Sequence, residues 1–112
     1  MKRIHYAGGS LLTGDDIADV LVRLAEALAL NNRAADIHAP AVTDRGTVSD
    51  VTLLIGPASQ MLAEVELYDG DELEDRPFVE EMEARVRELA PQRAGFVRNG
   101  TDGLDDVDID ML

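Results

Sequence analysis

The chain has 112 residues, of which 46% are hydrophobic, and a formal net charge of −13 from 23 acidic and 10 basic side chains. This length suits one domain with its own core. The negative charge repels nucleic-acid phosphates and anionic lipid, so neither nucleic acid nor a membrane is an expected partner. The absence of cysteine excludes disulfides and thiolate metal sites. Because no run of about 18 apolar residues occurs either, we expect a cytoplasmic protein.

The chain begins with a predicted β-hairpin. Residues 3–7 are typical of a strand, and Ser10-Leu11-Leu12 starts a second one. Gly8 and Gly9 lie between them, and glycine accepts the positive φ angles of a tight turn.

A helix is predicted next. Thr13 is expected to cap its free backbone N–H groups, and Asp15 and Asp16 suit the positive end of its dipole. The apolar residues that follow have the spacing of one helical face: Ile17, Val20, Leu21, Leu24 and Leu28. We expect Asn31-Asn32 to end this helix.

Three further strands are predicted over residues 35–42, 47–55 and 60–68, with a turn at Asp44-Arg45-Gly46. Alternation predicts which side chains face the core. The inward set is Val51, Leu53, Ile55, Met61, Ala63, Val65 and Leu67, and the outward set includes Asp50, Thr52, Glu64 and Glu66. Gly56-Pro57-Ala58-Ser59 is interpreted as a hairpin corner. A short helix over residues 57–62 is the alternative.

A second helix is predicted from Pro77, with an apolar stripe formed by Val79, Met82, Val86 and Leu89, and we expect Pro91 to end it. Residues 95–98 are interpreted as a short strand, and Asn99-Gly100 as a hairpin turn. The last residues alternate Asp with apolar side chains and are interpreted as an acidic, mobile tail.

The predicted order is therefore β-β-α-β-β-β-α. Most connections between strands are too short for parallel crossovers. We expect an α+β fold with a mainly antiparallel sheet of about five strands and two amphipathic helices on one face. Residues 1–91 form the single domain, and residues 92–112 form a C-terminal extension.

Two histidines are the candidate metal-binding or acid–base residues. His5 and His38 both lie in predicted strands, and His38 shares a face with Asp36. Imidazole with carboxylate can bind zinc or act as a base, but only if the groups lie within a few ångströms of each other. The alternative is two solvated histidines on the sheet, so we assign no catalytic, metal or cofactor-binding residue and expect no cofactor.

Other motifs do not indicate a specific chemistry. Gly8-Gly9 has the spacing of neither a P-loop nor a dinucleotide fingerprint. Ser10, Ser49 and Ser59 lie in no nucleophile elbow. The aspartates at 102, 105, 106, 108 and 110 lack the closing Glu and the flanking helices of an EF-hand. The tail's alternation resembles segments that add a strand to a partner's sheet.

The sequence favours a small acidic, non-catalytic protein-interaction domain with an adaptor, chaperone-like or regulatory role. Its charge supports an alternative, an acidic nucleic-acid mimic or inhibitor of a basic protein. A further alternative is a small metal-dependent or acid–base enzyme that uses His5 and His38.

We also expect a homodimer formed through a sheet face or a sheet edge. Leu54, Leu62 and Tyr68 are predicted on the outward face, among Asp50, Thr52, Glu64 and Glu66. Such an apolar patch favours pairing, and homodimers are the commonest soluble oligomers. A basic protein is the other expected partner, because the chain is strongly acidic.

Overall fold

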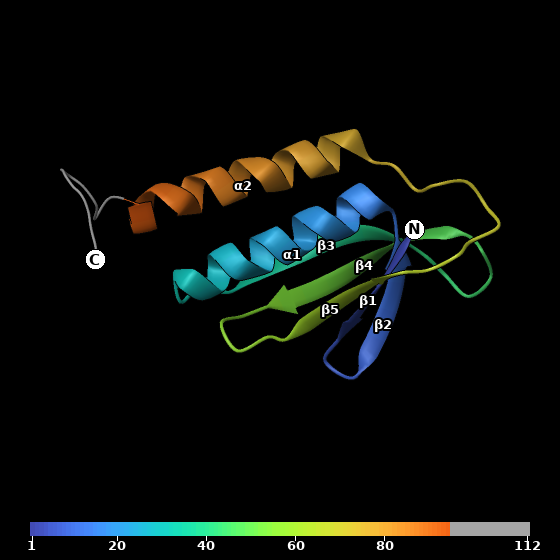
Figure 1. Ribbon diagram of the computed structural model, residues 1–112, viewed down its shortest axis with the longest axis horizontal. Helices are drawn as coiled ribbons and strands as arrows, with labels where there is room; N and C mark the ends of the chain where they lie inside the picture. Colours follow the sequence, from blue (N-terminus) through green and yellow to red (C-terminus); the bar gives the residue numbers. More distant parts are fainter. Residues whose placement is uncertain (95–112) are drawn as a thin grey trace.

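The strands and helices follow one another in the predicted order. The computed structural model describes residues 1–94. Its elements are β1 (Lys2–Tyr6), β2 (Gly9–Thr13), α1 (Asp15–Leu30), β3 (Ala35–Val42), β4 (Val48–Ile55), β5 (Met61–Val65) and α2 (Arg76–Ala94) (Figure 1). The strands form one antiparallel sheet in the order β4-β3-β2-β1-β5. The predicted α+β class is confirmed.

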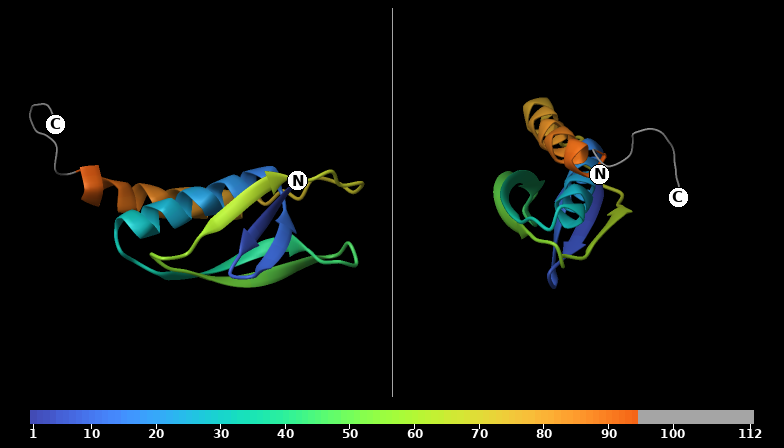
Figure 2. Two further views of the ribbon diagram at one scale, coloured as in Figure 1. Left: turned by 60° about the horizontal axis from the view of Figure 1, so that its bottom comes forward. Right: turned by 90° about the vertical axis from the view of Figure 1, so that its left-hand side faces the viewer.

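The sheet is strongly curved and wraps around α1 (Figure 2). β4 and β5 are its two edge strands, although only residues 56–60 separate them in the chain. Such a segment spans at most about 20 Å, so the two edges approach each other where β4 ends and β5 begins. The predicted hairpin corner at Gly56-Pro57-Ala58-Ser59 is wrong, because the segment joins opposite edges instead of neighbouring strands. The alternative helix over residues 57–62 does not form either.

The two helices form successive layers on the concave side of the sheet. α1 lies against the strands, and α2 packs against α1 (Figures 1 and 2). Because α1 contacts protein on two sides, its buried residues cover more than one face: Ile17, Ala18, Val20, Leu21, Leu24 and Leu28. The predicted stripe of α2 contributes Met82 and Leu89 to the core, and Phe78 adds a buried aromatic ring that the stripe omitted.

The first hairpin is confirmed, with its turn one residue earlier than predicted. Tyr6 pairs with Gly9, so the turn residues are Ala7 and Gly8. Both have positive φ angles, 51° and 81°, as a type I′ turn requires. The predicted turn between β3 and β4 is also confirmed, with Gly46 at a φ of 82°.

The first turn of α1 is capped by a residue far along the chain. Gly14 is the N-cap residue and offers no side chain. Instead, Glu72 Oε2 accepts a hydrogen bond from the Asp15 amide at 2.6 Å. Glu72 Oε1 accepts a second one from the α-amino group of Met1 at 3.0 Å. The segment before α2 thereby joins the start of α1 to the start of β1.

The predicted capping role of Thr13 is wrong. Thr13 is the last residue of β2 and is fully buried. Its Oγ1 donates a hydrogen bond to the Pro40 carbonyl of β3 at 2.8 Å. The hydroxyl therefore links two strands, because burial requires a partner for it inside the protein.

The helix ends match the sequence prediction in one case of two. α1 ends at Asn31 and Asn32, and Asn32 adopts a φ of 54°. The Arg33 amide then donates to the Leu28 carbonyl at 2.9 Å, which completes a Schellman motif. The predicted end of α2 at Pro91 is wrong, since the helix continues to Ala94. Proline removes one helical hydrogen bond, but its fixed φ stays helical.

The last strand is shorter and more exposed than predicted. β5 ends at Val65, so Leu67 and Tyr68 lie beyond the sheet. Ala63 pairs with Ile4 of β1, which places it on the predicted inward face. Ala63 and Val65 are nevertheless exposed, because β5 lies at the edge of the sheet. The predictions for residues 95–112 (a strand, a hairpin and an acidic tail) lie outside the described residues.

Candidate functional site

Polar side chains from three adjacent strands gather on the outer face of the sheet. Arg3 of β1 makes a bidentate pair with Glu66, with Nε–Oε1 and Nη2–Oε2 distances of 2.6 and 2.8 Å. Its Nη1 also donates to Ser10 Oγ of β2 at 3.1 Å. His5 Nε2 donates to Glu64 Oε1 of β5 at 2.7 Å. We call Arg3, His5, Ser10, Glu64 and Glu66 the outer-face cluster.

Charge pairing stabilises the ionised forms of Arg3 and Glu66. The hydrogen bond from Arg3 lowers the pKa of the Glu66 carboxyl, and the same bond raises the pKa of the Arg3 guanidinium. Bidentate arginine–carboxylate pairs fix geometry as well as charge. The cluster therefore fastens the end of β5 to β1.

The cluster resembles a nucleophile–base–acid set only in its residue types. Ser10 and His5 are direct neighbours across the β1–β2 pair. However, the Ser10 hydroxyl accepts its hydrogen bond from Arg3. A serine nucleophile needs a base that takes its proton, and a nearby guanidinium cannot serve as one. The arrangement supports strand pairing more directly than catalysis.

The two histidines do not share a site. His5 of β1 lies opposite Ser10 of β2, and Leu12 of β2 lies opposite Val42 of β3. Along the sheet, Ser10 lies two residues to one side of the Leu12–Val42 pair and His38 lies four residues to the other side. His5 and His38 are therefore offset by six residues along the strands, or about 20 Å. His38 Nδ1 instead lies 3.1 Å from Thr52 Oγ1 of β4. A zinc or acid–base site that uses both histidines requires them in contact, and the sheet separates them.

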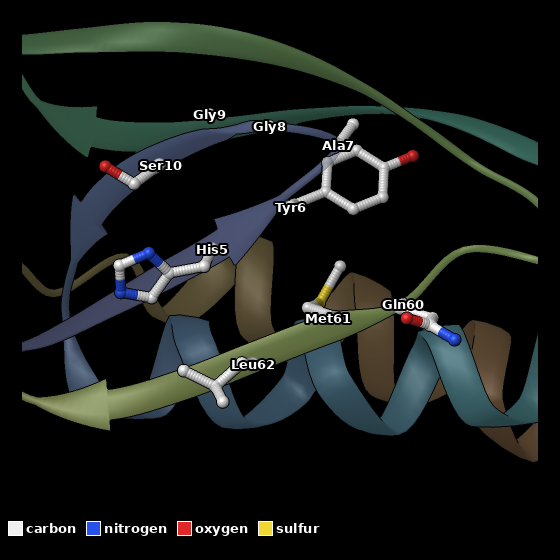
Figure 3. A pocket seen from close by; sticks show the side chains of 9 residues that line it. All are labelled: His5, Tyr6, Ala7, Gly8, Gly9, Ser10, Gln60, Met61 and Leu62. Atoms are coloured by element: carbon white, nitrogen blue, oxygen red, sulfur yellow. The ribbon is translucent and has the colours of Figure 1, made fainter.

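A shallow hollow of about 750 Å³ borders the outer-face cluster. Figure 3 shows its lining, which comes from the β1–β2 hairpin and the start of β5. His5, Ser10 and Leu62 provide the outer-face part of the lining, and Tyr6 and Met61 provide the other part. The hollow is open, and it lies where β5 pairs with β1 and not at the free edge of β5.

β5 and the residues that follow it carry three large apolar side chains that are exposed, including Val65 and Leu67, the two most exposed of the described residues. The exposed fractions are 57% for Leu62, 77% for Val65 and 97% for Leu67. Along residues 1–94, β5 pairs only with β1, so its other side presents unpaired backbone groups. The sequence pattern predicted Val65 and Leu67 as core residues. Val65 is exposed because β5 lies at the sheet edge, and Leu67 is exposed beyond the end of β5, and the sequence pattern contains neither fact.

The residues of the expected apolar patch, Leu54, Leu62 and Tyr68, come from three different segments of the fold. Leu54 and Leu62 are both exposed on the outer face, but they belong to the opposite edge strands β4 and β5. Tyr68 lies in the segment after β5. The sheet therefore offers two separate edges.

An acidic groove of about 490 Å³ lies between the first turns of α1 and α2. Six carboxylates and two arginines line it: Asp16, Asp19, Glu74, Asp75, Glu80, Glu83, Arg23 and Arg76. Three of these carboxylates already have cationic partners, in the pairs Lys2–Asp19, Arg23–Glu83 and Arg76–Glu80. The groove is negative, but about half of its carboxylates are paired.

Across residues 1–94, no three His, Asp or Glu side chains are placed to hold a metal ion. None of the helices in this part of the chain has the length and apolar character to cross a membrane. The aspartates considered for calcium lie outside it. No family model, no curated protein and no solved structure matches the chain.

Proposed function

We propose that this protein is a non-catalytic protein-interaction module that binds an extended segment of a partner along β5. The observation that carries the proposal is the free β5 edge beside Leu62, Val65 and Leu67, all of which are exposed. Unpaired N–H and C=O groups of an edge strand bind another strand, and flanking side chains select its sequence. An adaptor, chaperone-like or regulatory role uses this kind of contact.

The charge around β5 defines the chemistry of the partner. Residues 64–75, from the end of β5 to the start of α2, contain seven carboxylates: Glu64, Glu66, Asp69, Asp71, Glu72, Glu74 and Asp75. They contain no lysine or arginine. Opposite charge steers association and excludes unsuitable partners. The bound segment is therefore basic, with apolar side chains that cover either Leu62 on the outer face or Val65 on the opposite face. The absence of cysteine agrees with a cytoplasmic setting.

Site-specific photo-crosslinking in cell extract tests this assignment. A benzophenone amino acid replaces Val65 on β5 in one variant and Leu30, which is 51% exposed at the end of α1, in a control variant. We expect a discrete crosslinked partner from position 65 and none from position 30. Identical patterns from the two positions would contradict a binding surface at β5.

A defined peptide provides the second test. A fluorescent decapeptide of alternating Lys and Val is expected to bind, whereas its Glu and Val counterpart is not. Hydrogen exchange should then slow at the β5 amides, because a bound strand protects them. Binding without protection of β5 amides would place the peptide elsewhere.

The acidic groove supports a second candidate function, an acidic mimic that occupies the nucleic-acid site of a basic protein. Its complex would weaken steeply with salt, because exposed charges would dominate the contact. Binding along β5 includes backbone hydrogen bonds and apolar contacts and would keep much of its affinity. A salt titration of the isolated complex separates the two candidates.

A further inference from the structure

The sheet has a second free edge, at β4. This strand has eight residues and, in the part of the chain that the structure describes, pairs only with β3. Natural edge strands are usually protected by lysine, proline, a bulge or very short length. β4 contains no lysine or proline and one charged side chain, Asp50. An unprotected edge of this length is suited to pairing with another strand.

The outer-face side chains of β4 have a pattern that complements itself. Val48 and Leu54 lie near the two ends of the strand, and their exposed fractions are 61% and 63%. Asp50 and Thr52 lie between them on the same face, as their pairing with β3 shows. A reversed copy of the strand therefore presents its apolar ends to the apolar ends of the first.

We propose that β4 pairs antiparallel with β4 of a second copy of this chain, about a two-fold axis at Val51. In this register Val48 lies opposite Leu54 of the second copy, and Asp50 lies opposite Thr52. The two five-stranded sheets then form one continuous sheet. An axis at Asp50 would oppose the two carboxylates, and an axis at Thr52 would oppose Leu54 and Asp50. Cross-strand pairs of these kinds are unfavourable, so the Val51 register is selected.

Charge also favours β4 over β5 as the self-association edge. The net charge of −13 opposes dimerisation, but salt at physiological strength screens charges beyond about 8 Å. Only the charges close to the contact then matter. β4 and β5 each carry one carboxylate, Asp50 and Glu64, but β5 continues directly into residues 66–75, which carry six more. Two copies paired through β5 would bring these acidic segments together.

Light scattering of matched variants tests the proposal. The wild-type chain is expected to have twice the 12.1 kDa chain mass at micromolar concentration. Leu54→Lys should raise the dimer dissociation constant about 100-fold, because each dimer contains the substitution twice. Leu62→Lys, at a leucine of β5 with a similar exposed fraction (57% against 63% for Leu54), should remain dimeric. Circular dichroism checks that both variants are folded.

Three outcomes of this experiment would show that β4 is not the dimer interface. A monomeric wild-type chain, a folded Leu54→Lys variant that stays dimeric, or dissociation by Leu62→Lys would each overturn the proposal. These outcomes leave the partner-binding role of β5 untouched, because its own test uses different residues and a different measurement.

Single cysteines test the register, since the chain has no cysteine of its own. Val51→Cys places the two thiols opposite each other across the axis, within the Cα separation that a disulfide permits. Ser49→Cys places them four residues apart along the paired strands, or about 13 Å, which is too far. Mild oxidation should therefore crosslink the first variant and not the second. Equal crosslinking, or crosslinking through position 49 alone, would overturn the register.

Discussion

Gly14 is a residue at which the main chain leaves no room for a side chain. It precedes α1, and a Cβ atom there would overlap the carbonyl group of Leu73. The same approach brings the neighbouring Glu72 carboxylate to the Asp15 amide. One glycine thus allows the segment before α2 to cap α1.

Gly14→Ala is expected to destabilise the protein by about 2 kcal/mol, because the clash involves backbone that cannot move independently. Urea denaturation measures the loss as a lower midpoint. Gly9→Ala is the matched control, since its Cβ would make only an ordinary contact at 3.8 Å with the Tyr6 carbonyl oxygen. An equal effect of the two substitutions would show that the contact with Leu73 does not matter.

The cap of α1 could not be predicted from the local sequence. A threonine before two aspartates is a common helix-capping pattern, and the sequence alone predicts that role for Thr13. The structure gives the cap to Glu72, which lies 57 residues after Asp15. Local patterns contain no information on such a distant contact, because it depends on how α2 returns to α1.

The periodicity of the sequence predicted which segments form strands and which form helices, but not which strands are neighbours in the sheet. The predicted limits of β3 and the predicted apolar face of α1 are confirmed. β5 follows β4 in sequence, and a hairpin between them was the simple expectation. Instead, β5 pairs with β1 on the far side of the sheet from β4. The curvature of the sheet allows the short segment 56–60 to make this connection. The candidate site on β5 depends on this pairing and was therefore not predictable.

The connection between β1, α1 and the segment before α2 is sensitive to alkaline pH. The α-amino group of Met1 lies 2.9 Å from Asp15 and 3.0 Å from Glu72. Pairing with the Asp15 carboxylate and then with the Glu72 carboxylate raises its pKa above the ordinary value of 8.0. The folded state therefore holds this proton more tightly than the unfolded state does.

This contribution to stability is complete below pH 8 and is lost as the pH rises through the higher folded-state value. We expect the urea midpoint of the 112-residue chain to fall as the pH rises above 8. A variant with both Asp15→Asn and Glu72→Gln should show a weaker dependence in this range, because its amino group lacks both carboxylate partners. An unchanged slope in the double variant would assign the pH dependence to other groups.

The two free edges of the sheet, β4 and β5, lie at opposite ends of the strand order. Pairing through β4 leaves both β5 strands available, one from each copy. The proposed dimer is then a bivalent module, and its two partner sites act together only on a partner that presents several segments. Linked binding of this kind increases overall affinity without any new contact.

Loss of the dimer should therefore change avidity while leaving single-site affinity intact. In solution, the wild-type chain and Leu54→Lys are expected to bind the Lys and Val peptide with equal dissociation constants and one peptide per chain. On a surface coated densely with the same peptide, Leu54→Lys should dissociate at least about 10-fold faster, because it binds through one site only. Surface plasmon resonance at high and low peptide density makes the comparison. A lower affinity of Leu54→Lys for the peptide in solution would instead show that the β4 edge itself contacts the peptide. Equal dissociation rates of the two proteins on the dense surface would show that the two β5 sites do not act together.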